Sequence, residues 1–189
     1  FRTVTENVLR RSSSSEAPWT IIEGSDPRYR YLAVGKSILQ ALRARLDAGE
    51  THRPPVSSPP VMPHIDSLSV LKRLDLTHRL AKNKYEDELE KYQGRLNLLA
   101  RHDNFRKISV VTVFEGWDAA GKGGSIRHVI EALDARLYHI VQVAAPTEEE
   151  RAQPYLWRFW RHVPGRGRFA VFDRSWYGRV QVERVEGLC

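Results

Sequence analysis

One stretch decides the fold: residues Val110–Leu133, which read VVTVFEGWDAAGKGGSIRHVIEAL. It opens with a run of β-branched and aromatic residues, which is typical of a strand buried on both faces in a parallel sheet. A glycine-rich turn follows, and the apolar residues after the turn have helical spacing. The turn satisfies the pattern G-x-x-x-x-G-K at Gly116, Gly121 and Lys122. The stretch therefore predicts a strand, a phosphate-binding loop and a helix, in that order.

The chemistry of such a loop follows from its backbone. Glycines let several backbone N–H groups converge on phosphate oxygens, and the first turn of the following helix adds the positive end of its dipole. Lys122 would then bridge adjacent phosphates. The alternative is a strand-to-helix turn that binds no ligand. A Ser or Thr normally follows the lysine and binds Mg²⁺ through its hydroxyl, whereas here Gly123 fills that position.

A magnesium ion at this loop would need other oxygen ligands. Mg²⁺ usually takes one or two carboxylates together with phosphate oxygens and water. Asp118 lies inside the loop, and Asp173 ends the later run FAVFD, so both are candidate ligands. Ser125 could replace the missing hydroxyl ligand, but it lies two residues later than the usual Ser or Thr. It is also counted among the phosphate-binding residues. The alternative for Asp118 is a loop residue that hydrogen-bonds its own backbone.

Strand and helix patterns alternate to the end of the sequence. YHIVQVAA (138–145) and RFAVFDRSW (168–176) are predicted strands. Between them, Thr147 and Glu150 form the pattern of a capping box, and Pro154 is expected to split the segment into two short helices. This alternation predicts an α/β fold with a parallel sheet flanked by helices. Three strands are fewer than such sheets usually contain, so we expect a truncated sheet.

Two arginines follow Pro154 at positions that share one helical face. Arg158 and Arg161 would either reach a phosphate or pair with the acids of the preceding TEEE run, and we favour the pairing.

The sequence before the loop falls into three parts. Leu32, Leu39, Leu42 and Leu46 form a helical stripe in residues 1–46. Residues 47–67 hold five of the ten prolines and are predicted to be an extended linker. Apolar residues then recur every three to five positions from Leu76 to Leu99, which predicts one long amphipathic helix.

The composition favours a polyanionic partner. The net charge is +7, from 30 basic and 23 acidic residues, and arginine predominates among the basic ones. Arginine grips phosphate oxygens two at a time, although solvated arginines would equally serve solubility. The basic residues are not clustered and no zinc-finger or aromatic RNA-binding pattern occurs, so no specific nucleic acid is expected. No apolar run approaches the roughly 20 residues of a membrane span. Cys189 is the only cysteine, which makes the cytoplasm the simplest location.

Two passages resemble the polyphosphate kinase 2 family: FEGWDAAGKGGSI (114–126) and TEEE…PYLWRFWRHVPGRGRFAVFDRSWYGRV (147–180). The resemblance is dense from about residue 68 to residue 187. It implies a thymidylate-kinase-like P-loop fold and phosphoryl transfer between inorganic polyphosphate and nucleotides.

The resemblance also implies roles for single residues. Asp118 would face the acceptor phosphate and its Mg²⁺, Asp173 would hold Mg²⁺, and Arg174 would clamp the polyphosphate or the transferring group. Arg127 and Arg179 would be further polyanion contacts. The residues that would cradle the phosphates are Gly116, Gly121, Lys122, Gly123 and Gly124.

Residues 1–46, with their APW sequence, resemble the closing segment of the same type of domain. A domain tail (1–46), a linker (47–67) and a domain head (68–189) would follow one another as in the middle of a tandem protein. Such tandem forms resemble the branch that phosphorylates AMP to ADP. The alternative is that residues 1–46 are an unrelated helical extension. The family's lid would lie beyond Cys189, so we expect little or no turnover from these 189 residues alone.

The sequence thus predicts that the whole protein makes ADP from AMP and polyphosphate in the presence of Mg²⁺. One rival is an ATP-dependent P-loop kinase of small molecules, which the missing Ser or Thr after Lys122 disfavours. The other rival is a non-catalytic module that binds polyanions. The choice of acceptor (AMP, ADP or GDP) and association into a homo-oligomer are left open.

Overall fold

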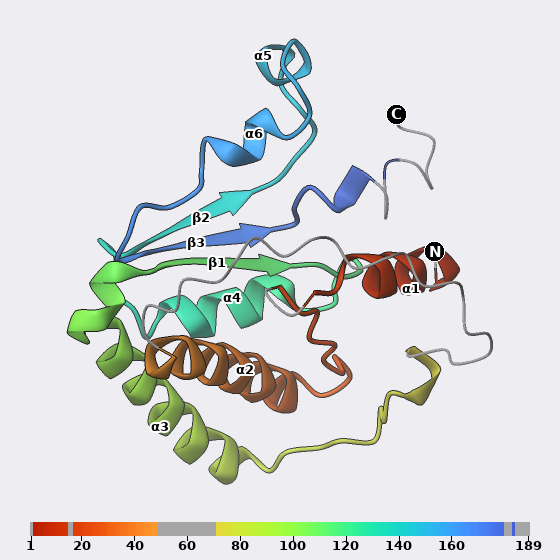
Figure 1. Ribbon diagram of the computed structural model, residues 1–189. Coiled ribbons are helices and arrows are strands. Elements are labelled where there is room, and N and C mark those ends of the chain that lie inside the picture. Colours follow the sequence, from red (N-terminus) through yellow and green to blue (C-terminus); the bar gives the residue numbers. More distant parts are fainter. Residues whose placement is uncertain (1, 15–16, 49–70, 180–182, 184–189) are drawn as a thin grey trace.

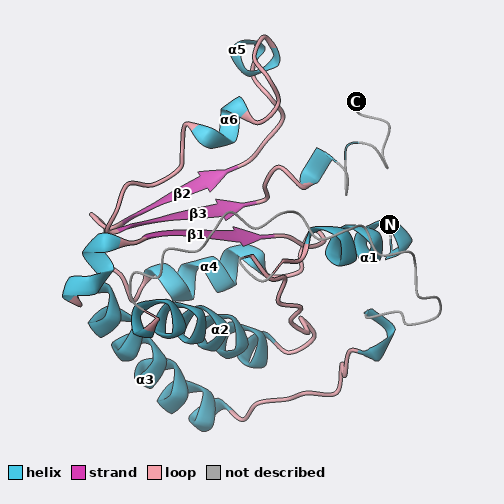
Figure 2. Ribbon diagram, viewed as in Figure 1, coloured by secondary structure: helices cyan, strands magenta, loops and turns pink. Residues whose placement is uncertain are grey.

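A three-stranded parallel sheet forms the centre of the computed structural model, which describes residues 2–14, 17–48, 71–179 and 183 (Figure 1). Helices cover both faces of this sheet (Figure 2), so the predicted α/β class is confirmed. Most of the predicted linker, 47–67, lies outside the described residues. Within the described part of the chain, none of the helices combines the length and apolar character needed to cross a membrane.

The three strands are β1 (Ser109–Phe114), β2 (Tyr138–Gln142) and β3 (Arg168–Asp173). Their order is β1-β3-β2, and Asp173 is the register partner of both Phe114 and Gln142. The carboxyl ends of all three strands therefore meet at one edge of the sheet.

The burial predicted for β1 is wrong. β1 is an outer strand of the described sheet, and Val111 on it is 42% exposed. The strand buried on both faces is β3, whose Phe169 and Val171 are both 0% exposed. Its place between β1 and β2 explains this burial.

The helices agree with most of the sequence prediction, but their ends differ. The helix predicted from Leu76 begins only at Lys82, because the backbone N–H of Leu80 bonds the carboxylate of Asp26 instead. A helix at residues 2–12 was not predicted. The α-helices are α1 (Arg2–Ser12), α2 (Pro27–Asp47), α3 (Lys82–Ala100), α4 (Lys122–Ile130), α5 (Glu148–Arg151) and α6 (Trp157–Trp160). Short 3₁₀ helices lie at Leu71–Arg73 and Asp103–Lys107.

The short helices after β2 confirm two local predictions. Thr147 and Glu150 form both bonds of a capping box at the start of α5. Pro154 separates α5 from α6, as expected. Arg158 pairs with Glu150 at 3.4 Å and Arg161 pairs with Glu149 at 3.9 Å, so both arginines pair with the acidic run rather than with the loop.

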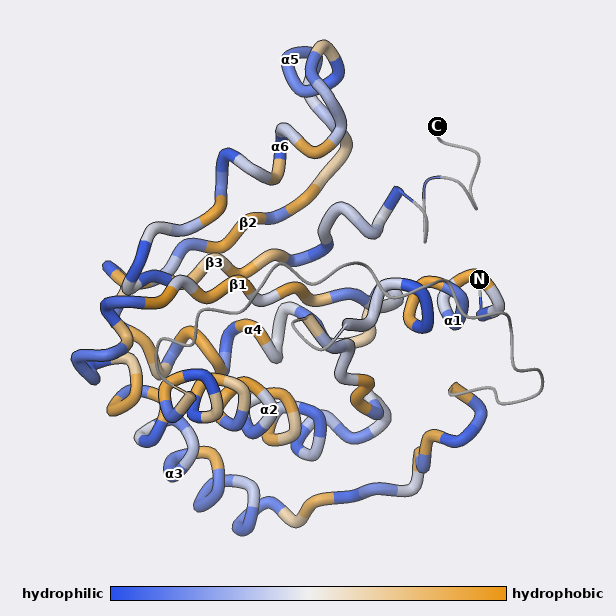
Figure 3. Tube along the Cα trace, in the orientation of Figure 1, coloured by the Kyte–Doolittle hydropathy of each residue, from blue (hydrophilic) through white to orange (hydrophobic). Residues whose placement is uncertain are grey.

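The core has one layer on each face of the sheet. On the first face, α2, α3 and α4 pack together over Phe169, and their most buried residues include Leu39 and Leu96. On the second face, Phe159 of α6 packs on Ala170 and Phe172. Figure 3 shows hydrophobic colour along the strands and hydrophilic colour on α5. Helix α2, from the predicted tail, thus shares a core with the predicted domain head.

Candidate functional site

The loop between β1 and α4 has the backbone of a phosphate-binding turn. Gly116 and Gly121 have φ values of 151° and 86°, which L side chains rarely adopt. Gly121 is also the N-cap of α4, so the helix N-terminus opens onto the loop. Lys122 folds back across the loop, and its Nζ donates to the carbonyls of Gly116 and Trp117 at 3.0 Å each. The ammonium group is therefore held over the turn.

The end of β3 lies beside this loop because Asp173 is paired in register with Phe114. The backbone N–H of Arg174 donates to the carbonyl of Phe114 at 3.0 Å. The Arg174 guanidinium bonds the Asp118 carboxylate, which is 90% exposed. The sheet thus gathers the four predicted catalytic residues, Asp118, Lys122, Asp173 and Arg174, at one edge.

Arg174 itself has an unusual backbone. Its φ of 67° lies in the left-handed region, which is uncommon for residues other than glycine. Such strain concentrates at functional sites, where it aims a side chain that a relaxed backbone would point elsewhere. Here it accompanies a guanidinium directed at the loop.

Asp173, a predicted Mg²⁺ ligand, is partly buried at the end of β3. Its Oδ1 atom is buried and has no hydrogen-bond partner among the described residues. A buried carboxylate oxygen without a donor is unfavourable unless a cation or another donor reaches it. The described residues contain no cluster of three or more His, Cys, Asp or Glu side chains suited to a metal. Mg²⁺ binding at Asp173 stays a prediction; the ion needs only one or two carboxylates when phosphate supplies the other oxygens.

Gly123, Gly124 and Ser125 in the first turn of α4 differ in how much space surrounds them. A Cβ added at Gly123 would meet nothing within 4 Å, so the backbone is open to a ligand there. A Cβ at Gly124 would lie 2.5 Å from the hydroxyl of Tyr31, so this glycine makes room for α2. The Ser125 hydroxyl is 2% exposed and donates to the carbonyl of Gly121 at 3.1 Å. A role in phosphate binding stays a prediction for each of the three.

Two predicted arginine contacts lie further from the loop. Arg127, one turn along α4, pairs with Glu131 at 2.9 Å. The guanidinium carbon of Arg179 lies 4.6 Å from the centre of the Tyr155 ring. Burial raises the pKa of Tyr155 to about 12, so the ring stays neutral beside the arginine at neutral pH. Their roles as polyanion contacts stay predictions.

Sequence reasoning missed a polar pair behind the loop, formed by the buried Ser175 and the partly buried Glu115. The hydroxyl of Ser175 donates to the Glu115 carboxylate at 2.6 Å. Burial raises the pKa of Glu115, and the hydrogen bond from Ser175 opposes that rise. Glu115 directly follows β1 and Ser175 lies two residues after the end of β3. The parallel pairing of these two strands is the signal that could have predicted the contact. The pair ties the end of β1 to the segment after β3.

The N-terminal segment also reaches this edge of the sheet. The Trp19 ring lies 4.9 Å from that of Tyr177, which follows β3. The carbonyl of Ala120 in the loop would lie 3.5 Å from a Cβ at Gly24. Tyr31 contacts the ring of His128 on α4 at 4.5 Å between centroids. Residues 19–31, which we call the wall segment, thus line one side of the loop.

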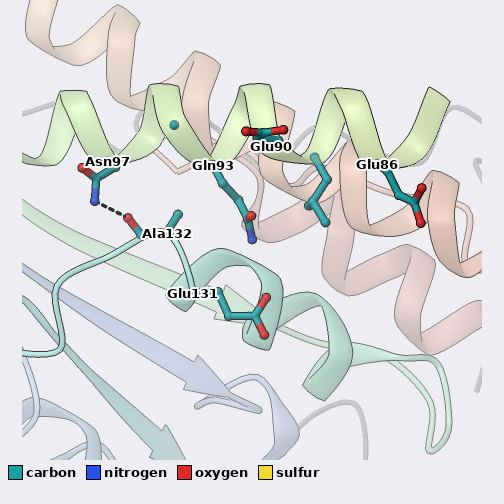
Figure 4. A pocket seen from close by; sticks show the side chains of 8 residues that line it. Glu86, Glu90, Gln93, Asn97, Glu131 and Ala132 are labelled. Carbon is teal, nitrogen blue, oxygen red and sulfur yellow. Dashed lines mark hydrogen bonds between the residues drawn. The ribbon is translucent and has the colours of Figure 1, made fainter. Parts of the chain in front are cut away.

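A separate hollow lies between α3 and the C-terminal end of α4 (Figure 4). Glu86, Glu90 and Glu131 are among its lining residues, and Asn97 donates to the carbonyl of Ala132 at 2.9 Å beside them. These carboxylates would repel a phosphate chain. The hollow is therefore no candidate for a polyanion, and the loop stays the predicted site.

Comparisons with known proteins point to one family. The family model for polyphosphate kinase 2 matches residues 79–189. The polyphosphate:AMP phosphotransferase of Pseudomonas aeruginosa is 55% identical over 184 residues, which are 97% of this chain and 37% of the relative. The GDP-polyphosphate phosphotransferase of Mycobacterium tuberculosis is 44% identical over 108 residues, 56% of this chain and 36% of the relative.

Among solved structures, one assigned to polyphosphate kinase 2 of P. aeruginosa is 53% identical, with a TM-score of 0.63. The alignment covers 99% of this chain and 36% of that one. The chain spans just over a third of the length of the curated relatives that it matches most extensively. The strand-to-helix loop, the acid at the end of β3 and these matches lead to one conclusion: the chain belongs to the polyphosphate kinase 2 family.

Proposed function

We propose that the protein to which this chain belongs transfers a phosphoryl group from inorganic polyphosphate to AMP and so forms ADP. The observation that carries the proposal is the edge where Lys122 lies over a glycine loop beside Asp173, whose Oδ1 atom has no hydrogen-bond partner among the described residues. Relatives named polyphosphate:AMP phosphotransferase match 97% of the chain, which supports AMP as the acceptor. The single cysteine supports a cytoplasmic location.

The reaction requires alignment and charge neutralisation rather than a covalent protein intermediate. An oxygen of the AMP phosphate forms a bond to the terminal phosphorus of the polyphosphate while the bridging P–O bond breaks. The shortened polyphosphate leaves with the electron pair of that bond. Backbone N–H groups at Gly121–Gly123 and the Lys122 ammonium would hold the phosphates in line. Lys122 can do so by exchanging its loop carbonyls for phosphate oxygens.

Asp173 and Asp118 would hold Mg²⁺ at this edge, and the ion would neutralise phosphate charge when bound. Asp118 now bonds Arg174, so its carboxylate would leave the guanidinium to reach a cation. The released guanidinium of Arg174 would then face the phosphate chain, as a planar fork suited to its oxygens. The ion pair of Asp118 and Arg174 would thus keep both side chains beside the loop until the substrate and the cation bind and separate them.

The test is a coupled ADP assay on the complete gene product with AMP, long-chain polyphosphate and Mg²⁺, without ATP. We expect ADP to form, and expect Lys122→Ala and Asp173→Asn each to lower kcat by about 100-fold or more. Lys91→Ala, an exposed lysine on α3 that pairs with Glu88, is the matched control and should keep full activity. A product that appears only when ATP is added would identify an ATP-dependent kinase instead. Binding of polyphosphate without any turnover would identify a non-catalytic module.

A further inference from the structure

Arg30, near the start of α2, lies directly on the phosphate loop. A Cβ added at Gly121 would overlap the Arg30 guanidinium, with Nε, Cζ and Nη2 as its nearest atoms. The Nη1 atom donates to the carbonyl of Gly24 at 2.7 Å, and Gly24 in turn lies against Ala120 of the loop. The guanidinium is therefore fixed at the N-terminus of α4, although it comes from a segment about 90 residues earlier in the sequence.

Positive charge lies close to Arg30. None of the ion pairs found among the described residues involves Arg30. Its Nε atom is buried and has no hydrogen-bond acceptor among the described residues. Lys122 begins α4 next to Gly121, and the N-terminal end of that helix is itself positive. The Arg30 guanidinium and a helix N-terminus thus meet at Gly121, while the Lys122 ammonium lies over the same loop. An anion bound there would be stabilised by all three.

We propose that Arg30 is a phosphate-binding residue of this site and that its Nε–H and Nη2 donate to a phosphate oxygen held over Gly121. The inference rests on the proposed function and adds a residue to it. The ligand is a phosphate chain, because a guanidinium offers a planar pair of donors that matches phosphate oxygens. The wall segment therefore supplies part of the substrate site and not only a packing surface.

The experiment measures binding of inorganic tripolyphosphate to the complete gene product by titration calorimetry at several salt concentrations. Arg30→Met removes the charge but keeps an apolar stem against the Tyr31 ring, which lies 4.9 Å from the guanidinium carbon. We expect Arg30→Met to weaken binding about tenfold or more and to reduce its dependence on salt. Arg30→Lys should recover part of the affinity. The control is Arg43→Met, an exposed arginine on the same helix, which should bind as the parent does.

Four outcomes test this inference against its alternatives. Parent-like binding in Arg30→Met, together with weakened binding in Lys122→Ala, would overturn it and leave the proposed function in place. Arg30→Met could instead melt at a lower temperature without ligand and yet bind tripolyphosphate with unchanged affinity and salt dependence below that temperature. This result would assign Arg30 a structural role and would also overturn the inference. Parent-like binding in Lys122→Ala as well would contradict the proposed function itself. A combined loss in the double variant smaller than the product of the single losses would support a shared phosphate.

Discussion

Replacing Leu39 by alanine tests whether helix α2 is part of the core of the P-loop unit. Leu39 is 2% exposed and lies in one buried cluster with Leu96 of α3 and Val129 of α4. The change removes three carbon groups, worth about 2.4 kcal/mol of lost burial at ~0.8 kcal/mol each. The cavity left behind adds to this, so the free energy of unfolding should fall by about 3–4 kcal/mol. Domains of this kind are stable by about 5–15 kcal/mol, so the loss would be large.

The measurement is urea unfolding of the 189-residue chain, followed by far-UV circular dichroism and by tryptophan fluorescence. With an m value of about 2 kcal/mol per molar, the midpoint should fall by about 1.5–2 M urea. Leu98→Ala is the matched control, because Leu98 on α3 is 71% exposed and loses little burial. A Leu39→Ala variant within about 0.5 kcal/mol of the parent, like the control, would refute the shared core.

The other predictions concern the loop and the pair behind it. Gly121→Ala should destabilise the chain by about 1–2 kcal/mol in thermal unfolding, because the residue has a φ of 86° and its Cβ would displace Arg30. Gly94→Ala, in open space on α3, should instead stabilise the chain slightly, and equal effects of the two would contradict this reasoning. Burial raises the pKa of Glu115, so the neutral acid favours folding at low pH, and this contribution is lost as the pH rises through the raised pKa. Glu115→Gln should therefore unfold at a higher temperature than the parent at neutral pH, and the difference in melting temperature should disappear toward about pH 4. A difference in melting temperature that does not depend on pH would contradict the raised pKa of Glu115.

The features predicted correctly from the sequence depend on neighbouring residues. The capping box of Thr147 and Glu150 and the break at Pro154 each involve only a few positions along the chain, so the residues present determine the outcome. The turn at Gly121 is local in the same way. Strand positions were also predicted, but the place of each strand in the sheet was not. The run 110–114 has the composition of a buried strand, yet its neighbours in space decide its exposure.

The candidate site also contains features that local sequence predicts and features that depend on tertiary packing. Asp173 was predicted from its place at the end of a strand, and parallel pairing brought it to the loop as expected. The bond between Arg174 and Asp118 and the pair of Glu115 with Ser175 depend on rotamers and register, for which the sequence carries only weak signals. Arg30 could not be found in this way, because its contact with the loop arises from tertiary packing of a segment assigned to another domain.

The left-handed backbone of Arg174 favours glycine, whereas the contact with Asp118 requires an arginine side chain. Glycine there would relieve an unfavourable conformation of about 1 kcal/mol or more, but it would delete the guanidinium that meets Asp118. Selection for thermostability alone would therefore favour a residue that abolishes the contact. An engineer who seeks a more stable protein should leave this position unchanged and look for stabilising substitutions in the helices that cover the sheet.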